Sequence, residues 1–388
     1  MKKKICILGS TGSIGKSTLN IIRNYKSKLE VVALSTNKNV RLIIKQSKEF
    51  DVKNLIINDF QSYKKILKYD LNKRIRIFNN ISDFLNINKF KFDVTIVGIS
   101  GFDGLDPTLK VIPHSKNLSS ANKESIICGW KFINNKLKKY KTNFIPLDSE
   151  HFSIWSLIKD SDLKMISKIY LTASGGPFFN KPKSKIINAK ISDVIKHPNW
   201  DMGHKISVDS ATLMNKLFEL IEASKLFNLP MNKFDIIIHP KSYVHALVNF
   251  KNGLSKILIH ETKMEIPIFN SIFNKTSEIY NENKDINFEN LNGKNFIKPS
   301  KSIFPLLKVI NEYKQKDSYF EIILVTVNDY FVKKFLNGQI NFQKMQINLL
   351  KKLKDPYLSK YYKKFPKKIN DIFKMVYKVN AYLENENI

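Results

Sequence analysis

The N-terminal stretch constrains the fold more than any other part of this sequence. Lys4–Leu8 is an apolar run typical of a buried strand, Gly9–Gly15 is a turn with a glycine at every third position, and a helical pattern continues to Ile22. Glycines allow a tight turn and the close approach of a pyrophosphate, while the helix N-terminus supplies amide donors and a positive dipole. This order predicts a dinucleotide-binding domain rather than a glycine-rich turn without a ligand. The expected cofactor contacts are Gly9, Ser10, Thr11, Gly12, Ser13, Ile14 and Gly15.

The end of the predicted second strand indicates which dinucleotide is bound. Val31–Leu34 is followed by Ser35 to Asn39, a segment that contains no acid. NAD sites usually place Asp or Glu here to hold the ribose 2′-hydroxyl. Small polar groups and one cation suit a 2′-phosphate instead. The sequence therefore favours NADP over NAD, with Asn37, Lys38 and Asn39 as contacts.

Helix and strand patterns alternate through the rest of the N-terminal region. Val94–Gly98 is strand-like and ends in a glycine turn, at the carboxyl edge where doubly wound sheets bind ligands. Asn117–Ser125 is a further strand that ends in a polar turn. Lys123 in that turn is expected to face the nicotinamide or the substrate. The alternative is one more solvent-exposed lysine among many.

The segment Leu147–His151 places two carboxylates, a hydroxyl and an imidazole next to one another. Phe144–Leu147 is predicted to be a short strand. If that strand continues, Asp148 and Glu150 share a face, because strand side chains alternate. Two carboxylates on one face repel unless a cation lies between them, and a hard divalent cation prefers oxygen ligands. The alternative is an acidic turn before a helix, with Ser149 or Asp148 as the N-cap.

Two later loops suggest an anion site and a lid. The strand Ile169–Thr172 runs into the small-residue turn Ala173–Phe178, whose N–H groups and hydroxyl suit a phosphate or oxyanion. The segment His197–Gly203 carries Trp200 and Met202 between a proline and a glycine, as in mobile lids. The alternative is a packed Ω-loop whose tryptophan belongs to the core.

A polar helix face adds candidate oxygen ligands. In the predicted helix Ala211–Phe227, Asn215 and Glu219 lie one turn apart on one face, beside Lys216. Such a face, turned toward an Asp-x-Glu strand end, would complete a metal site. The alternative is an ordinary amphipathic helix whose polar side faces water.

Composition limits the class of protein. The 388 residues suffice for two or three domains, and a hydrophobic fraction of 43% is ordinary for a globular chain. The net charge of +31 normally suggests nucleic acid, but the lysines are spread along the chain without a stacking pattern, so we expect no nucleic-acid partner. The two cysteines form no disulfide or metal pattern. With no membrane span, signal or transit segment expected, we predict a cytoplasmic protein.

Pattern changes along the chain predict an α/β fold in several parts. Residues 1–147 form an N-terminal Rossmann-type NADP-binding domain. Residues 148–273 are expected to form a central α+β catalytic and dimerisation domain, with a hairpin at Asn252-Gly253. The Asn-rich segment 274–300 is expected to be a linker. Residues 301–388 are helical in pattern and are expected to form a C-terminal helix bundle.

Together these motifs resemble those of the 1-deoxy-D-xylulose 5-phosphate reductoisomerase family. The likeness is dense from residue 4 to about residue 270 and weaker afterward. Several separate motifs in one order are far more specific than any one alone. The motifs that carry it are Gly9–Gly15, Ala121–Ser125, Leu147–His151, Ser174–Phe178, His197–Gly203 and Lys205–Lys216.

The resemblance implies roles for individual residues. The implied ligands of Mg²⁺ or Mn²⁺ are Asp148, Glu150 and Glu219, which with Lys123 form the catalytic group. The implied substrate contacts are Lys123, Ser149, Glu150, Ser174, His197, Trp200, Met202, Ser210, Asn215, Lys216 and Glu219. Of these, Trp200 and Met202 match a mobile flap. Further implied cofactor contacts are Asn122, Glu124 and Gly203.

The implied activity is the NADPH-dependent rearrangement and reduction of a sugar phosphate, 1-deoxy-D-xylulose 5-phosphate, to 2-C-methyl-D-erythritol 4-phosphate. This reaction belongs to isoprenoid precursor biosynthesis. A metal would act as a Lewis acid on adjacent substrate oxygens. A homodimer is implied by the resemblance alone. Two alternatives are an NADP-dependent dehydrogenase of another sugar phosphate and a basic nucleic-acid-binding protein that keeps the fold.

Three segments depart from the family's usual pattern. Leu217-Phe218 replaces Gly-Leu between the helix lysine and glutamate, which adds side-chain volume near the implied metal site. Thr36-Asn37 replaces Ala-Gly at the end of the second strand, and Val327 to Asp329 stands where Ala-Asn-Glu is usual. The first departure bears on how Glu219 is placed.

Overall fold

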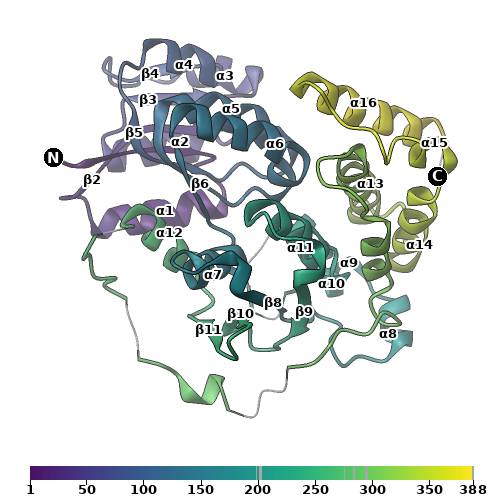
Figure 1. Cartoon of the computed structure of the whole chain (residues 1–388). Coiled ribbons are helices and arrows are strands. Elements are labelled where there is room, and N and C mark those ends of the chain that lie inside the picture. Colours follow the sequence, from purple (N-terminus) through teal and green to yellow (C-terminus); the bar gives the residue numbers. More distant parts are fainter. Residues whose placement is uncertain (198, 201–202, 275, 283–284, 293–295, 387–388) are drawn as a thin grey trace. The chain divides into compact units, whose positions relative to one another are not determined.

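The computed structural model describes residues 1–197, 199–200, 203–274, 276–282, 285–292 and 296–386 (Figure 1). The chain forms two compact units. The first unit consists of Met1–Ser125, Lys131–Phe152 and Lys263–Asp285, and the second of Ile126–Trp130, Ser153–Thr262 and Ile286–Ile388. The units therefore cut the chain differently from the predicted domain boundaries, which remain predictions.

The first unit is built on a seven-stranded sheet in the order β4-β3-β2-β1-β5-β6-β7. All six strand pairings are parallel, as expected of a Rossmann-type sheet. The order steps away from β1 in both directions, which places the switch point between β1 and β5. The strands are β1 (Lys3–Leu8), β2 (Leu29–Thr36), β3 (Asn54–Ile57), β4 (Arg76–Phe78), β5 (Phe92–Val97), β6 (Ser115–Ser120) and β7 (Asn143–Pro146).

Amphipathic helices accompany this sheet. They are α1 (Ser13–Asn24), α2 (Val40–Phe50), α3 (Phe60–Ile66), α4 (Ile81–Ile87), α5 (Leu105–Val111) and, much later in the chain, α12 (Glu265–Ile272). Two more helices, α6 (Lys123–Tyr140) and α7 (Ser149–Ile158), contribute residues to both units.

The core of the first unit includes residues that lie far apart in the sequence. Helix α12 lies beside α1 (Figure 1), and its Ile268 and Phe269 are buried in the same cluster as Ile5 and Leu34 of the sheet. The apolar face of α12 therefore completes a core that the N-terminal strands begin.

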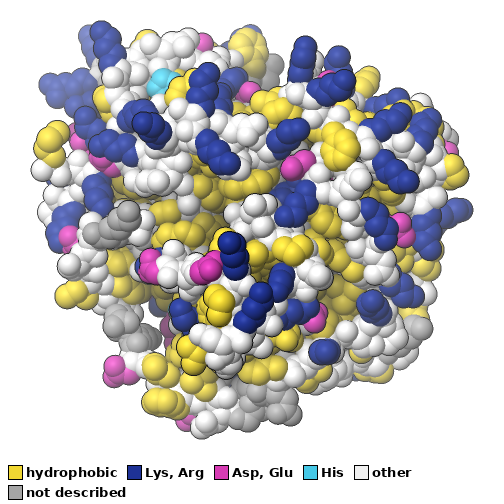
Figure 2. Space-filling view, viewed as in Figure 1, with side chains coloured by type: hydrophobic (Ala, Val, Ile, Leu, Met, Phe, Trp, Pro, Cys, Tyr) yellow, Lys and Arg dark blue, Asp and Glu magenta, His cyan; other side chains and the backbone are white. Residues whose placement is uncertain are grey.

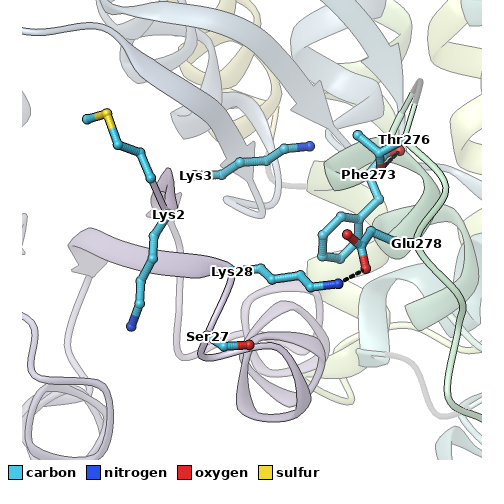
Figure 3. A pocket seen from close by; sticks show the side chains of 8 residues that line it. Lys2, Lys3, Ser27, Lys28, Phe273, Thr276 and Glu278 are labelled. Atoms are coloured by element: carbon cyan, nitrogen blue, oxygen red, sulfur yellow. Dashed lines mark hydrogen bonds and ion pairs between the residues drawn. The ribbon is translucent and has the colours of Figure 1, made fainter.

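The chain after α12 also binds the amino edge of the sheet. A pocket of about 390 Å³ lies there, lined by Lys3, Lys28, Phe273 and Glu278 among others (Figure 3). Lys28 forms an ion pair with Glu278, and Lys3 Nζ donates to the carbonyl of Ile272 at 3.1 Å. Side-chain contacts thus tie the returning segment to the start of β1 and β2.

The second unit contains a four-stranded mixed sheet in the order β11-β10-β8-β9. The pairing of β8 with β9 is parallel, and the pairings of β10 with β8 and β11 are antiparallel. This sheet confirms the predicted α+β character and the hairpin at Asn252-Gly253. Its strands are β8 (Ile166–Ala173), β9 (Phe234–Ile238), β10 (Val244–Phe250) and β11 (Ser255–Ile259).

Apart from α6 and α7, the α-helices in the described part of the second unit fall into two groups. Four belong to the middle of the chain: α8 (Lys183–Ile187), α9 (Ile191–Val194), α10 (His204–Ala211) and α11 (Met214–Leu226). The other four follow residue 301 and confirm the predicted C-terminal helical region: α13 (Tyr319–Leu336), α14 (Phe342–Leu353), α15 (Pro356–Ser359) and α16 (Ile369–Asn385).

The predicted helix Ala211–Phe227 is wrong at its beginning. Leu213 adopts a left-handed backbone conformation with φ of 59°, which ends α10 and starts α11. The sequence offers no Gly, Pro or Asn at this position, so the break has no local signal.

Basic side chains are spread over the face shown in Figure 2, with acidic ones between them. On this face the basic side chains are therefore not gathered into one patch. In the described part of the chain, no helix has both the length and the apolar character needed to cross a membrane.

Candidate active site

The glycine turn after β1 is held in shape by β2 and β5. The N–H of Gly9 donates to Ser35 Oγ at 2.9 Å, and Gly9 has a φ of +86°, which favours glycine. A Cβ on Gly9 would lie 2.8 Å from the carbonyl carbon of Gly98, and a Cβ on Gly15 would lie 2.4 Å from the carbonyl oxygen of Gly9. The backbone therefore packs too closely for side chains here. This geometry fits the close-approach turn of a dinucleotide site.

The end of β2, where a 2′-phosphate site is predicted, presents polar groups. Thr36 Oγ1 and Thr11 Oγ1 share a hydrogen bond of 2.7 Å, which joins β2 to the turn. Asn37 and Lys38 are exposed. The Asn39 side chain caps α2, because its Oδ1 accepts from Leu42 N at 3.1 Å.

Asn122 also has a structural task in addition to its predicted place in the cofactor site. Its Oδ1 accepts from Ser125 N at 2.7 Å and caps α6, while its Nδ2 donates to the carbonyls of Ile99 and Gly101. It therefore fixes the loop after β5 against the start of α6. The neighbouring Glu124 is buried in the first turn of α6.

The carboxylates of Asp148 and Glu150 are brought together by a helix start. Strand β7 ends at Pro146, so the expectation that the strand continues through Glu150 is wrong. Asp148 Oδ1 accepts from Glu150 N at 3.3 Å, a capping contact in the first turn of α7. One oxygen of each carboxylate nevertheless lies within 4.8 Å of the other. The cap and the paired carboxylates coexist because the helix turns Glu150 back toward Asp148.

The two carboxylates have positively charged and polar neighbours. Lys123 forms an ion pair with Asp148, whose side chain is 9% exposed. His151, which is fully buried, places Nδ1 at 3.0 Å from Asp148 Oδ1, and Ser149 Oγ donates to Glu150 Oε2 at 2.6 Å. Sequence reasoning missed His151 as a site residue, although it stands within the motif. These contacts orient a pair of oxygen donors that suits a hard divalent ion.

In the second unit, α11 groups three of the predicted site residues. Glu219 is 1% exposed and receives Asn215 Nδ2 and Lys216 Nζ on its two oxygens, each at 2.5 Å. The polar side of this helix is therefore buried, which excludes the interpretation that it simply faces water. Leu217 and Phe218, the residues that replace Gly-Leu, are each 1% exposed and pack inside the unit.

The turn after β8, which is predicted to hold an anion, has a backbone conformation that favours glycine. Gly175 and Gly176 both have positive φ, at 83° and 66°, and the N–H of Gly176 donates to Ser174 Oγ at 3.0 Å. A Cβ on Gly176 would lie 3.1 Å from the carbonyl oxygen of Ser210, so the turn lies against the last turn of α10. Ser174 and Ser210 thus come from two segments that pack together.

His197 contacts this turn. Its Nε2 lies 3.0 Å from Ser174 Oγ, and its Nδ1 accepts from the N–H groups of Asn199 and Trp200. Burial, and secondarily the charge of Lys216, lowers the pKa of His197 to about 4, so the ring is neutral at physiological pH.

The predicted lid is described in part. Trp200 lies edge-on to His245 with ring centroids 6.3 Å apart. Gly203 is exposed and forms the N-cap position of α10. Met202 lies outside the described residues.

Three family models match the chain, each over a different region. The model described as 1-deoxy-D-xylulose 5-phosphate reductoisomerase matches residues 5–129. Its C-terminal domain model matches residues 144–227, and the model described as DXP reductoisomerase C-terminal domain matches residues 260–382.

Similar proteins cover nearly the whole chain. The reductoisomerase of Pelagibacter ubique (strain HTCC1062) is 48% identical over 95% of this chain and 96% of its own length. That of Wolbachia pipientis wMel is 38% identical over 88% of each chain. The solved reductoisomerase of Zymomonas mobilis, in complex with NADPH, matches with a TM-score of 0.88 at 28% identity over 98% of each chain.

A second solved reductoisomerase is in complex with NADPH, fosmidomycin and magnesium. It matches with a TM-score of 0.88 at 29% identity, over 98% of this chain and 97% of that one. With three matched regions in order and close relatives along its length, this chain belongs to the 1-deoxy-D-xylulose 5-phosphate reductoisomerase family.

Proposed function

We propose that this protein converts 1-deoxy-D-xylulose 5-phosphate to 2-C-methyl-D-erythritol 4-phosphate with NADPH and a divalent metal ion, in isoprenoid precursor biosynthesis. The carboxylate pair of Asp148 and Glu150 carries the proposal, because paired oxygen donors are what this metal-dependent reaction requires. The family membership supports the substrate and the cofactor.

The metal ligands in this proposal are Asp148, Glu150 and Glu219. Three carboxylates suit Mg²⁺ or Mn²⁺, which prefer oxygen ligands. A bound ion would supply Lewis-acid polarisation of adjacent substrate oxygens. Magnesium is present in a solved relative, whereas use of Mn²⁺ is our expectation.

The protein's own groups would orient the reacting oxygens. The Lys123 ammonium lies next to Asp148 and can donate to a substrate oxygen from that position. Ser149, Asn215 and Lys216 supply further donors for the substrate's hydroxyl and carbonyl oxygens. Their present contacts to Glu150 and Glu219 keep these donors ordered before substrate arrives.

The substrate's phosphate is assigned to the cradle of Ser174, His197, Ser210, Asn215 and Lys216. The Ser174 hydroxyl provides an uncharged donor, and Lys216 provides the positive charge. Trp200 and Met202 are assigned to the lid that excludes water over the bound substrate.

NADPH is assigned to the turn Gly9–Gly15 and the end of β2. The close backbone packing around Gly9 and Gly15 fits a pyrophosphate at the N-terminus of α1. Lys38 and Asn37 are assigned to the 2′-phosphate, and Asn39, Asn122, Glu124 and Gly203 to the rest of the cofactor site. NADPH supplies the hydride that reduces the rearranged aldehyde.

Turnover of 1-deoxy-D-xylulose 5-phosphate tests the proposal. We expect NADPH oxidation that depends on Mg²⁺ or Mn²⁺ and a branched product identified by NMR. No oxidation at any metal concentration would contradict it. Hydride transfer without skeletal rearrangement would instead indicate a dehydrogenase of another sugar phosphate.

We also propose that the protein is a cytoplasmic homodimer. Strand β11 is the outermost strand of its sheet, and Ile257 on it and Leu254 before it are 51% and 61% exposed. An exposed apolar sheet edge suits a second copy of the chain. Light scattering coupled to gel filtration should give twice the monomer mass of 45.1 kDa, and Ile257→Lys should shift the population toward monomer.

A further inference from the structure

The hydrogen bonds around His197 determine where its proton lies. Nδ1 accepts from Asn199 N at 3.1 Å and from Trp200 N at 3.0 Å. A ring nitrogen that accepts carries no proton, so the proton of the neutral ring is on Nε2. Nε2–H then donates to Ser174 Oγ at 3.0 Å.

These contacts determine what the Ser174 hydroxyl can still donate or accept. Its Oγ accepts from His197 Nε2 and from Gly176 N, at 3.0 Å each. A hydroxyl offers two acceptor lone pairs and one proton, so both lone pairs are engaged and the proton remains to be donated. A donated O–H is what an anion such as a phosphate requires from Ser174.

The segment that supplies the two N–H groups to His197 is anchored by one side chain. Asn199 Nδ2 donates to the carbonyl of Pro240 at 2.7 Å and to Ser242 Oγ at 3.0 Å. These acceptors belong to the connection between β9 and β10, where Ser242 is buried and has a φ of 52°. The acceptors of the anchor therefore lie on a connection between two strands of the sheet, outside the segment predicted to be the lid.

We infer that Asn199 is a positioning residue that acts through His197 on Ser174, so that the Ser174 hydroxyl proton points to the anion in the cradle. The inference rests on the proposed function for the identity of that anion, the substrate's phosphate. Asn199 itself touches neither substrate nor cofactor in this role. The two N–H bonds of the Asn199 side-chain amide hold the segment in place. The backbone N–H groups of Asn199 and Trp200 therefore stay directed at His197 Nδ1, which fixes the tautomer of the His197 ring.

Substitution of Asn199 by Ala and by Asp tests the inference. Asn199→Asp keeps the size of the side chain but removes both Nδ2 donors, so it should behave like Asn199→Ala. We expect the KM for the substrate to rise about 10-fold in each variant, since an ordered hydrogen bond contributes on the order of a tenfold change. The kcat and the KM for NADPH should change less than about twofold. An unchanged substrate KM would overturn the inference.

A double-mutant cycle with Ser174→Ala separates positioning from general destabilisation. If Asn199 acts through Ser174, Asn199→Ala should add little to the KM of the Ser174→Ala variant. If Asn199→Ala raises the KM equally in the wild type and in the Ser174→Ala variant, the proposed action of Asn199 through His197 on Ser174 (the relay) is contradicted. Asn270→Ala is the matched control, because Asn270 Nδ2 also donates to a backbone carbonyl, that of Ile266 at 2.8 Å, from the exposed side of α12. It should leave the substrate KM unchanged.

A measurement without turnover distinguishes failure of this inference from failure of the proposed function. In protein with ¹⁵N-labelled histidine, NMR should show His197 as the pure Nε2–H tautomer. The Asn199→Ala variant should show a mixture. A wild-type protein with a mixed tautomer would refute the relay even if the enzyme is active. A pure tautomer in a protein that does not turn over the substrate would leave the relay standing and remove the phosphate assignment.

Discussion

At the scale of single residues, the acidic pair shows how one side chain serves two purposes. Asp148 caps the first turn of α7 and also presents a carboxylate oxygen beside that of Glu150. His151 and Lys123 lie on either oxygen of Asp148, which offsets the repulsion between the two carboxylates. The charge balance of the pair is therefore set by neighbours within the same unit.

Replacing Glu150 tests its assignment as a metal ligand. Glu150→Gln keeps the shape of the side chain but removes the negative charge that would balance a divalent ion. We expect kcat/KM to fall by about 100-fold or more and the metal affinity to fall by about 10-fold or more. Circular dichroism and the Tm should match the wild type, since Glu150 is only half-buried. Near-normal turnover would remove Glu150 from the ligand set.

His260 should make stability depend on pH. Its ring stacks on His245 with centroids 3.6 Å apart, and its Nε2 is buried without a hydrogen-bond partner in the part of the chain that is described. Burial lowers its pKa from 6.5 to about 4, so between these values the unfolded chain binds more protons than the folded one. Stability should therefore fall as the pH falls from 6.5 toward 4, and this contribution is absent above 6.5.

Urea unfolding at several pH values checks this expectation. The His260→Gln variant should lose less stability across the same pH window than the wild type. Any difference between the two proteins above pH 6.5 measures packing alone. Parallel pH profiles of the two proteins would contradict the expected role of His260.

Residue types and spacing predicted much of the site, but not its hydrogen-bond directions. Asp148 and Glu150 could be recognised as candidate metal ligands because two neighbouring carboxylates repel each other unless a cation lies between them. The tautomer of His197 depends on Asn199 and Trp200 folding back onto it, and Asn199 depends on a carbonyl at Pro240. Such long-range backbone partners leave no pattern in the sequence.

At the scale of elements, α11 and α13 are joined by a buried charge pair. Lys225 on α11 lies 2.8 Å from Glu321 on α13, and each side chain is 1% exposed. Burial raises the pKa of Glu321 to about 7, against the opposing effect of Lys225. Lys225 also lies 2.7 Å from Asp317, so its ammonium compensates two carboxylates.

Lys225→Met should destabilise the second unit strongly. Removing one member of a buried pair leaves an uncompensated charge and typically costs about 3–5 kcal/mol. We expect a clear fall in the urea midpoint, smaller at pH 6 than at pH 8 because protonated Glu321 carries no charge. The double variant Lys225→Met/Glu321→Leu should recover much of the loss. If the double variant is no more stable than Lys225→Met, the loss of stability does not come from the uncompensated charge of Glu321.

Element boundaries were predictable where the signal was local. The glycine turn between β1 and α1 and the hairpin before β11 follow from Gly9, Gly15 and Asn252-Gly253. The break at Leu213 was not predictable, because packing around α10 and α11 imposes a left-handed conformation on a residue that does not favour it.

At the scale of the whole molecule, the first unit is assembled from three separate stretches of chain. Sequence patterns change near residues 147 and 273, and boundaries drawn there divide α12 from the sheet it covers. Periodicity shows that α12 has an apolar face but cannot show which sheet that face meets. The sequence alone therefore did not show that α12 packs against strands that lie more than 200 residues earlier in the chain.

A fragment of residues 1–152 should not fold stably alone. Without α12 and its following turn, the core loses Ile268, Phe269, Ile272 and Phe273, each worth about 1.5–3 kcal/mol when fully buried. That loss is comparable to the whole stability of a typical domain. Thermal unfolding of the fragment should lack a cooperative transition. Adding a peptide of residues 263–285 should restore the transition, and a cooperative fragment without the peptide would contradict the expectation.

The position of α12 also has a consequence for synthesis on the ribosome. The strands of the first unit emerge early, but the helix that completes their core is translated only after the entire four-stranded sheet of the second unit. Until then a strip of apolar surface along α1 stays uncovered, and translation at about 5–20 residues per second keeps it so for several seconds or more. During that time we expect the nascent chain to bind chaperones, and the length of chain between β7 and α12 sets how long the apolar surface is exposed.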